Sequence, residues 1–250
     1  MKNMKDYYEK LHNNGKEYSA GVYDIKQLLN IRCVKEWVAN HTDTSVKVLD
    51  IGCGKGVFLR DFIETLKSEY SVSCNSAIGI DLVESPGNVF AELEIDSEII
   101  LQNLDGEKLN LPDDAFEIIT CNHVLEHIFE TENLLREIHR VLKPKGLCIL
   151  STPNLAAWIN RGLLLCGIQP LGTELGIESI TYGFRPETAK KRLQSFTPAG
   201  HIRSFTPGAL KDIFTTVGLN TIGWWNQDRI PIFRITKWAG RGIGIIATKY

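Results

Sequence analysis

The feature that most constrains the fold is an apolar run that leads into an aspartate and three closely spaced glycines, VKVLDIGCGKG at 46–56. The β-branched and aliphatic residues around Asp50 predict a strand that is buried on both faces. Glycine permits positive φ and lets a ligand approach the backbone, while the amides at the start of a following helix attract polar groups. The segment therefore predicts a strand, a ligand-binding loop and a helix in succession.

The glycine spacing bears on the kind of ligand. A dinucleotide-binding loop has the pattern G-x-G-x-x-G, whereas here Gly56 comes one place early and Val57 holds the position of the third glycine. A carboxylate at Asp50 suits an ammonium or hydroxyl group better than a pyrophosphate. Both observations argue against NAD. The helix after the loop is predicted from apolar residues with a period of 3.6: Phe58, Leu59, Phe62, Ile63 and Leu66.

Further apolar segments predict strands at 77–82, 99–101, 116–121 and 147–150. Between the last two of these strands, Thr131 is expected to cap a helix that Pro144 and Gly146 end. Strands that alternate with helices predict a doubly wound parallel α/β sheet, and right-handed crossovers bring the carboxyl ends of its strands to one edge. Ligands of such sheets bind at that edge.

Three segments, DIGCGKG at 50–56, LPDDAFEIITCNHVLEHI at 111–128 and RVLKPKGLCILSTPN at 140–154, resemble class I S-adenosylmethionine-dependent methyltransferases. The resemblance implies a Rossmann-like sheet of seven mostly parallel strands with an antiparallel last strand, the final pair lying at 220–225 and 244–248. It also implies S-adenosyl-L-methionine as methyl donor and S-adenosyl-L-homocysteine as product. The branch that methylates small molecules and cell-surface glycans is the most similar.

We expect the cofactor to contact the glycine loop and the ends of the next three strands. Asp81 can accept both hydroxyls of a ribose. The resemblance makes Asp105 a candidate for the adenine amino group, although an aspartate before Gly106 is as typical of a turn. The predicted cofactor-binding residues are Asp50, Gly52, Cys53, Gly54, Gly56, Asp81, Leu82, Leu104, Asp105, Asn122 and His123.

Methyl transfer requires alignment of donor and acceptor and, for a hydroxyl or amine, removal of one proton. His123, at the end of a strand, is the first candidate for the catalytic base and His201 is the second, although some members of the family need no dedicated base. The resemblance implies that Glu126 and His127 mainly support the residues that contact the ligands and do not contact the ligands themselves. His201 and Arg203 either face the acceptor or anchor their loop, and both alternatives stay open. No metal site is expected.

Two additions flank the predicted methyltransferase domain at 46–250. Residues 1–45 are expected to form a helical cap, with an amphipathic helix over about 25–40, and an acceptor-side insertion is expected at about 155–205. Tyrosines of the cap could line the site or simply pack; they are Tyr7, Tyr8, Tyr18 and Tyr23. The apolar segment that begins the insertion packs on the sheet, grips an apolar acceptor or lies on a membrane surface, and packing is the favoured alternative.

Charge is distributed unevenly along the chain. From residue 185 to the end there are eleven Lys or Arg and three acids, a balance of +8, whereas the preceding residues hold 17 basic and 27 acidic groups, a balance of −10. This suggests an acceptor-side lobe that faces something anionic, such as a phosphorylated or nucleotide sugar, a lipid-linked phosphate or a membrane surface. A solvated basic face explains the same pattern equally well.

Composition indicates one catalytic unit of 250 residues, 43% hydrophobic, with six cysteines but no C-x-x-C pair. Free thiols and the lack of a signal peptide or of an apolar run of ~20 residues predict a cytoplasmic protein. The sequence thus predicts a methyltransferase for a small-molecule acceptor, with transfer to O, N or C. The acceptor classes considered are anionic sugars, nucleotide sugars, lipid-linked compounds and quinone-like compounds. A nucleic-acid substrate is not expected, because CNHV stands where base methylases carry an N-P-P-Y-like motif. A cofactor-binding protein with no methyl transfer, or a protein methyltransferase, is the alternative.

Overall fold

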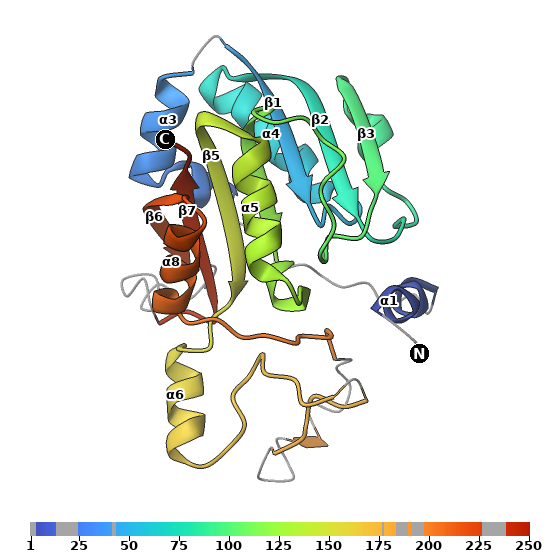
Figure 1. Ribbon diagram of the computed structural model, residues 1–250, viewed down its shortest axis with the longest axis vertical. Helices are drawn as coiled ribbons and strands as arrows, with labels where there is room; N and C mark the ends of the chain where they lie inside the picture. The colour runs from blue at the N-terminus through green and yellow to red at the C-terminus, as the bar shows by residue number, and fades with distance from the viewer. Residues whose placement is uncertain are drawn as a thin grey trace.

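A seven-stranded sheet forms the centre of the computed structural model, with the strand order β3-β2-β1-β4-β5-β7-β6 (Figure 1). The structure describes residues 4–13, 25–41, 44–176, 178–183, 190–191, 198–226 and 239–250. The strands are β1 (Ser45–Ile51), β2 (Ser73–Asp81), β3 (Asp96–Leu101), β4 (Phe116–Asn122), β5 (Leu142–Pro153), β6 (Asn220–Asn226) and β7 (Gly242–Thr248).

Strands β1 to β5 pair in parallel, and β7 lies antiparallel between β5 and β6. This confirms the predicted sheet of seven mostly parallel strands with an antiparallel last strand. The carboxyl ends of β1 to β5 meet at one edge, the lower edge in Figure 1, because parallel strands joined by right-handed crossovers share their direction.

Helices cover both faces of the sheet. They are α1 (Met4–Asn13), α2 (Ile25–Leu29), α3 (Arg32–Ala39), α4 (Val57–Tyr70), α5 (Thr131–Val141), α6 (Trp158–Leu165) and α8 (Pro207–Thr216), with 3₁₀ turns η1 (Phe90–Glu92) and η2 (Leu125–His127). One core lies under α5 and α8, and the other lies under α2, α3 and α4. No helix in the described ranges is both long enough and apolar enough to cross a bilayer.

Alternation along each strand explains how one sequence supplies two cores. Ile118 and Ile149 face α2 to α4, while the next residues along, Ile119 and Leu150, face α5 and α8. Because both faces are covered, both sets of positions are apolar. The strands therefore read as continuous hydrophobic runs, as the sequence predicted.

Three predicted boundaries were wrong. The single helix expected over about 25–40 is two helices, because Ile31 is extended (φ −65°, ψ 132°) and begins a new helix. Thr131 is the first residue of α5 and not its cap, which is Glu130. Strand β5 begins at Leu142, which pairs with Phe116 ahead of an irregularity in the ladder, so Pro144 lies within the strand and not in a loop.

The segment that follows β5 extends beyond the edge where the strands end, and α6 lies there (Figure 1). The orientation of α6 contradicts the favoured prediction that its apolar side packs on the sheet. Its one fully buried residue is the polar Asn160, while Trp158, Ile159 and Leu165 are exposed by 53%, 48% and 90%. The side chain of Asn160 donates to the carbonyls of Asn154 and Leu171, which explains why the polar face turns inward.

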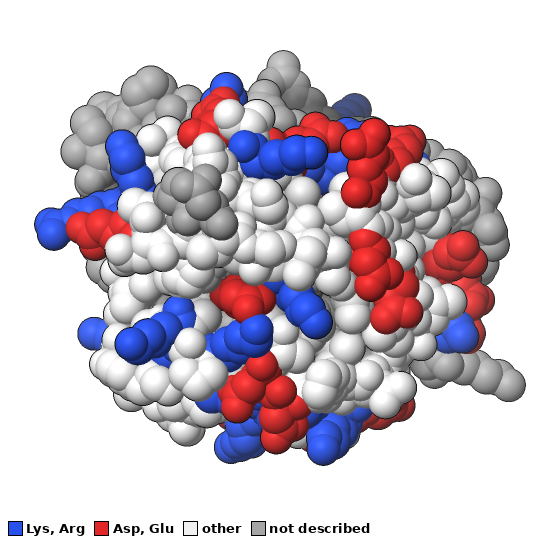
Figure 2. Space-filling view, turned by 90° about the horizontal axis from the view of Figure 1, so that it is seen from above, with Lys and Arg blue, Asp and Glu red and all other residues white. Residues whose placement is uncertain are grey.

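Basic and acidic residues are intermixed on the face in Figure 2, which is the end of the molecule opposite the strand edge. Lys249, in the basic part of the sequence, pairs with Asp114 in the acidic part.

Candidate active site

The glycine loop between β1 and α4 is built from backbone conformations that favour glycine. Gly52, Gly54 and Gly56 all have positive φ, at 72°, 53° and 78°. A Cβ at Gly52 would lie 2.1 Å from Val124 Cγ2, so a larger residue cannot fit there. A Cβ at Gly54 would meet no atom within 4 Å, so this glycine borders open space. The loop is therefore held tightly at one side and accessible at the other.

Asp50, at the end of β1, is a buried carboxyl group. Thr120 Oγ1 donates to its Oδ1 at 2.6 Å. Burial raises the pKa of Asp50 to about 7, the hydrogen bond from Thr120 opposes that rise, and the nearby charge of Asp81 adds to it. The pair of acids makes this part of the edge suited to a positively charged group.

Asp81, at the end of β2, joins the second strand to the glycine loop. Its Oδ2 accepts from the Gly54 amide at 2.8 Å and its Oδ1 accepts from the Leu82 amide at 2.7 Å. Its Oδ1 also accepts from the Val83 amide at 3.5 Å, so this carboxylate holds the glycine loop against the segment that follows β2. The predicted position of Asp81 at the strand edge, beside the loop, is what the structure shows.

A cleft of about 470 Å³ opens beside the end of β2. Helix α1 forms one wall with Lys5 and Glu9, and the strand ends form the other with Leu82, Leu101 and Asn103. Figure 1 shows α1 beside the ends of β2 and β3. The cleft has the size of a small-molecule site and lies where ligands of α/β sheets bind.

Other predicted cofactor residues have clear structural roles. Asp105 accepts from the backbone amides of Phe129 at 3.0 Å and Glu130 at 2.8 Å, so it secures the start of α5, and its contact with an adenine stays a prediction. Leu104 is buried in the core beneath the edge. Burial raises the pKa of the Cys53 thiol, which therefore stays protonated and acts as a packing group.

Asn122 and His123 lie at the carboxyl end of β4, as predicted. Ser151 Oγ donates to Asn122 Oδ1 at 2.7 Å, and Asn122 Nδ2 is buried with no hydrogen-bond partner in the described part of the chain. A buried donor of this kind requires an acceptor, which a bound ligand can supply. His123 has a φ of 56°, a conformation that turns the chain sharply out of the sheet.

The Glu126 side chain is fully buried, and its carboxylate accepts hydrogen bonds from residues at the ends of β4 and β5. Its Oε1 lies 3.0 Å from His123 Nδ1, and its Oε2 accepts from Thr152 Oγ1 at 3.0 Å. Burial alone would raise the pKa of Glu126, but the hydrogen bond and charge of His123, together with His127, hold that pKa below its usual range. The carboxylate is therefore ionised, and His123 must donate through Nδ1, which places the lone pair of the neutral ring on Nε2.

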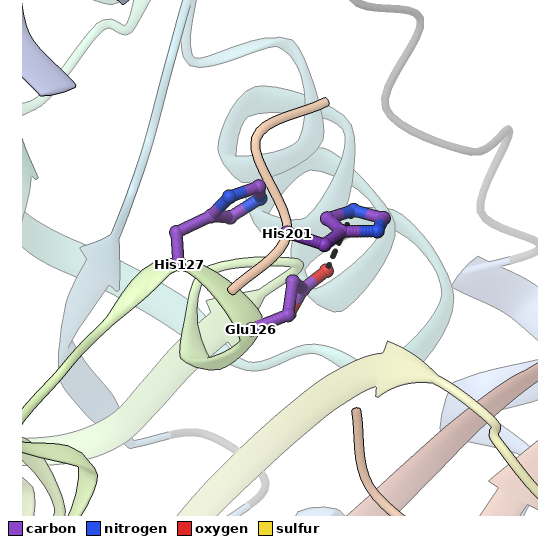
Figure 3. A group of neighbouring side chains, drawn as sticks. All are labelled: Glu126, His127 and His201. Atoms are coloured by element: carbon purple, nitrogen blue, oxygen red, sulfur yellow. Dashed lines mark ion pairs between the residues drawn. The ribbon is translucent and has the colours of Figure 1, made fainter. Parts of the chain in front are cut away.

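His201 reaches the same carboxylate from a distant segment (Figure 3). Its Nε2 lies 3.9 Å from Glu126 Oε1, and its Nδ1 lies 3.2 Å from the Gly172 carbonyl oxygen. The His127 ring lies 5.0 Å from the His201 ring, and burial lowers the pKa of His127. The structure thus brings both predicted base candidates to Glu126.

Arg203 anchors its loop, which decides one of the alternatives left open by the sequence. Its guanidinium donates to the carbonyls of Ile128 and Phe129 and so ties the loop to the segment after η2. Tyr7 is buried and donates to the Pro198 carbonyl, and burial raises the pKa of this phenol to about 12, with a further rise from Glu174. Tyr18 and Tyr23 lie outside the described residues.

Glu174 is an important residue that sequence reasoning missed. Its carboxylate accepts from the backbone amides of Ala199, Gly200 and His201 at 2.6–3.1 Å, and so shapes the loop that carries His201. The partners are separated by at least 25 positions in the chain and follow no local pattern. No feature of the sequence could have identified them.

Comparisons with known proteins agree with this geometry. A family model described as methyltransferase domain matches residues 24–222. A ubiquinone biosynthesis O-methyltransferase of Pseudomonas putida (strain W619) is 32% identical over 112 residues, which are 43% of this chain and 44% of the relative. The corresponding enzyme of Pseudomonas paraeruginosa (strain DSM 24068 / PA7) is 29% identical over 137 residues, 52% of this chain and 55% of the relative. The chain thus spans about half the length of these curated relatives.

Solved structures share the fold over nearly the whole chain. The 1,6-didemethyltoxoflavin-N1-methyltransferase of Burkholderia thailandensis, with bound 1,6-didemethyltoxoflavin and S-adenosylhomocysteine, superposes with a TM-score of 0.58 at 14% identity and covers 98% of this chain and 87% of that one. A SAM-dependent methyltransferase from Aquifex aeolicus superposes with a TM-score of 0.56 at 15% identity, with 98% of both chains covered.

The buried carboxyl of Asp50 predicts a pH dependence of stability. Its pKa is about 7 in the folded protein and 3.8 ordinarily, so the folded chain binds this proton more tightly. The resulting stabilisation is fully present below about pH 4 and is lost as the pH rises to about 7. Asp50→Asn keeps an oxygen acceptor for Thr120 and removes the ionisation.

We expect the free energy of unfolding of Asp50→Asn, relative to the unchanged protein, to increase by on the order of 4 kcal/mol between about pH 4 and pH 8. Denaturant titrations at each pH, without cofactor, measure this difference. Asp96→Asn is the control, because Asp96 is exposed at the start of β3. A difference for Asp50→Asn that does not change with pH would contradict the assignment.

Proposed function

The chain belongs to the class I S-adenosylmethionine-dependent methyltransferases, in the methyltransferase-domain family, and on that premise we propose that it methylates a hydroxyl group of a small, apolar, quinone-like acceptor. The enzyme is a methyltransferase of small molecules, and its cofactor is S-adenosylmethionine. The observation that carries the finer proposal is the buried Glu126 carboxylate that orients His123 at the end of β4.

A hydroxyl acceptor follows from the need for a base. S-adenosylmethionine supplies a methyl group on a positively charged sulfur, so the protein has to align the acceptor and accept its proton. The Glu126 carboxylate holds Nδ1 of His123 in its protonated form, which leaves Nε2 as the basic nitrogen. A histidine oriented by a buried carboxylate is the arrangement by which enzymes activate hydroxyl groups. His201 is the second candidate for this role.

A small apolar acceptor is supported by two observations. The curated relatives that match part of the chain are described as ubiquinone biosynthesis O-methyltransferases. In this chain, Trp158, Ile159 and Leu165 of α6 expose apolar surface just beyond the end of β5. A surface of this kind is suited to an acceptor with an apolar portion, free or at a membrane surface. An anionic acceptor has less support, since it rests on the distribution of charge along the sequence alone.

The cofactor site that we propose runs along the strand edge from the glycine loop to the end of β4. Asp81 and Leu82 border the cleft where a ribose would bind, and the open side of Gly54 leaves room for the amino-acid portion. Asp50 supplies negative charge for the ammonium group, and the buried Nδ2 of Asn122 requires an acceptor. These residues fit S-adenosylmethionine in charge and in hydrogen-bonding capacity.

We also propose a helical cap at 1–45, a methyltransferase domain at 46–250 with an insertion at about 155–205, and a cytoplasmic location. The acceptor-side insertion is consistent with the position of α6 beyond the strand edge. The six cysteines are free thiols, and Cys53, Cys74, Cys121 and Cys148 are buried, which suits a reducing compartment.

Asp81→Asn tests the cofactor site. The variant loses the charge that strengthens hydrogen bonds to ribose hydroxyls, so we expect the Kd for S-adenosylmethionine to rise ~10- to 100-fold. Isothermal titration calorimetry measures this change. Asp96→Asn, at the opposite end of the neighbouring strand, should bind as the unchanged protein does. Unchanged binding by a folded Asp81→Asn protein would remove Asp81 from the site.

His123→Asn tests the base. Asparagine tolerates the positive φ at this position but cannot accept the proton, so turnover should fall by ~10²- to 10⁴-fold. The Kd for S-adenosylmethionine should change by less than about threefold, because backbone geometry is kept. His139→Asn on α5, away from the strand edge, is the matched control. Near-normal turnover of His123→Asn would exclude His123 as the base.

The acceptor class is tested by incubating the enzyme with S-adenosylmethionine that carries a labelled methyl group and with a cell extract separated into polar small molecules, organic-extractable small molecules, nucleic acid and protein. We expect label in the organic-extractable fraction, and we expect the label to disappear with His123→Asn. Label confined to the protein, nucleic-acid or polar fraction contradicts the proposed acceptor while leaving the methyltransferase activity in place.

A further inference from the structure

Glu126, His127 and His201 form a cluster with the composition of a metal site. Each offers one ligand atom, and these three atoms all lie within 4.8 Å of one another. Figure 3 shows the side chains converging from two segments, η2 and the loop that precedes α8. Glu126 also orients the proposed base His123, but the proposed cofactor site contains none of the three residues.

Hydrogen bonds set the protonation of both imidazoles. His127 Nδ1 lies 3.1 Å from the Gly200 carbonyl oxygen, and His201 Nδ1 lies 3.2 Å from the Gly172 carbonyl oxygen. A carbonyl can only accept, so each ring donates through Nδ1 and, when neutral, carries its lone pair on Nε2. Metal-binding histidines are oriented in this way, with the second ring nitrogen donating to a backbone carbonyl.

The lone pair of His201 Nε2 then lies close to a carboxylate oxygen that also accepts from His123 Nδ1. His201 Nε2 lies 3.9 Å from Glu126 Oε1, and Glu126 is completely buried. A neutral imidazole nitrogen and a carboxylate oxygen repel at such a distance unless a cation lies between them. We propose that Glu126, His127 and His201 bind a divalent metal ion of the zinc class.

The backbone already holds the two segments together. The amides of Ile202 and Arg203 donate to the Glu126 carbonyl at 2.9 and 3.1 Å. Glu174 binds the amides on the other side of His201, and its Oε1 lies 3.9 Å from His201 Nδ1. Tetrahedral zinc needs ligand distances of about 2.0–2.2 Å, so its ligand atoms lie about 3.4 Å apart. The three ligand atoms, which lie within 4.8 Å of one another, therefore have to move closer together when the ion binds.

The donor set favours zinc over magnesium. Two imidazoles and one carboxylate suit zinc and related transition metals, whereas magnesium prefers oxygen ligands alone. Three protein ligands leave one coordination position for a water molecule or an acceptor oxygen. When the ion is bound, His201 is a metal ligand and cannot act as the base. His123 then stays as the candidate base. The site departs from the expectation of no metal, because 74 residues separate His127 from His201 and no motif joins them.

The test uses the full chain without a polyhistidine tag, titrated with Co²⁺ in an absorption experiment and with Zn²⁺ in a calorimeter. We expect one ion per chain and the absorption of four-coordinate Co²⁺. His201→Ala and His127→Ala should weaken binding by more than ~100-fold, and Glu174→Gln, which acts through His201, by ~10-fold. His139→Ala and His41→Ala are matched controls that should bind normally. Circular dichroism checks that each variant is folded.

Three results overturn the proposal: no stoichiometric binding, equal binding by folded His201→Ala, or weaker binding by His139→Ala. Neither methyl donor nor acceptor is present in these titrations. Their outcome is therefore separate from that of the proposed methyl transfer.

Discussion

The site depends on one buried charge, the carboxylate of Glu126. An ionised group without access to water must be fully hydrogen-bonded, because its desolvation is otherwise too costly. His123 and Thr152 satisfy its two oxygens from the ends of neighbouring strands, and its backbone carbonyl accepts two amides from the segment beyond His201. Glu126 thus joins β4, β5 and the loop that precedes α8. This is why the candidate base His123 and His201 meet at the strand edge.

Polar contacts hold together the described residues beyond that edge. Asn160 is buried and bonds to the chain on both sides of α6, while Glu174 holds the loop that carries His201. The buried side of α6 carries the polar Asn160, and apolar side chains of α6 such as Trp158 and Leu165 are exposed. The lobe therefore contributes an apolar surface close to where the methyl acceptor must bind, and this surface agrees with the proposed quinone-like acceptor.

Sequence predicted the fold and the places of the glycine loop, Asp50 and Asp81 at the strand ends because those features are local. A buried strand, a loop of glycines and an amphipathic helix each have a short pattern, and the acids at Asp50 and Asp81 follow directly from the ends of their strands. Asp105 shows where local reasoning stopped, since its bonds to the amides of Phe129 and Glu130 depend on a segment 24 residues away. The orientation of α6 could not be predicted from its sequence pattern either, because a helix usually packs through its apolar side.

The amino-acid sequence by itself determined the doubly wound sheet, the position of its ligand-binding edge and the methyltransferase family, because strand periodicity and the spacing of glycines are properties of neighbouring residues. Only the tertiary structure decided which polar groups meet at that edge. Thr152, Glu174 and His201 reach Glu126 and its surroundings across 26 to 75 positions of sequence. Contacts over such distances follow from the way segments pack, and no local pattern of residues specifies them.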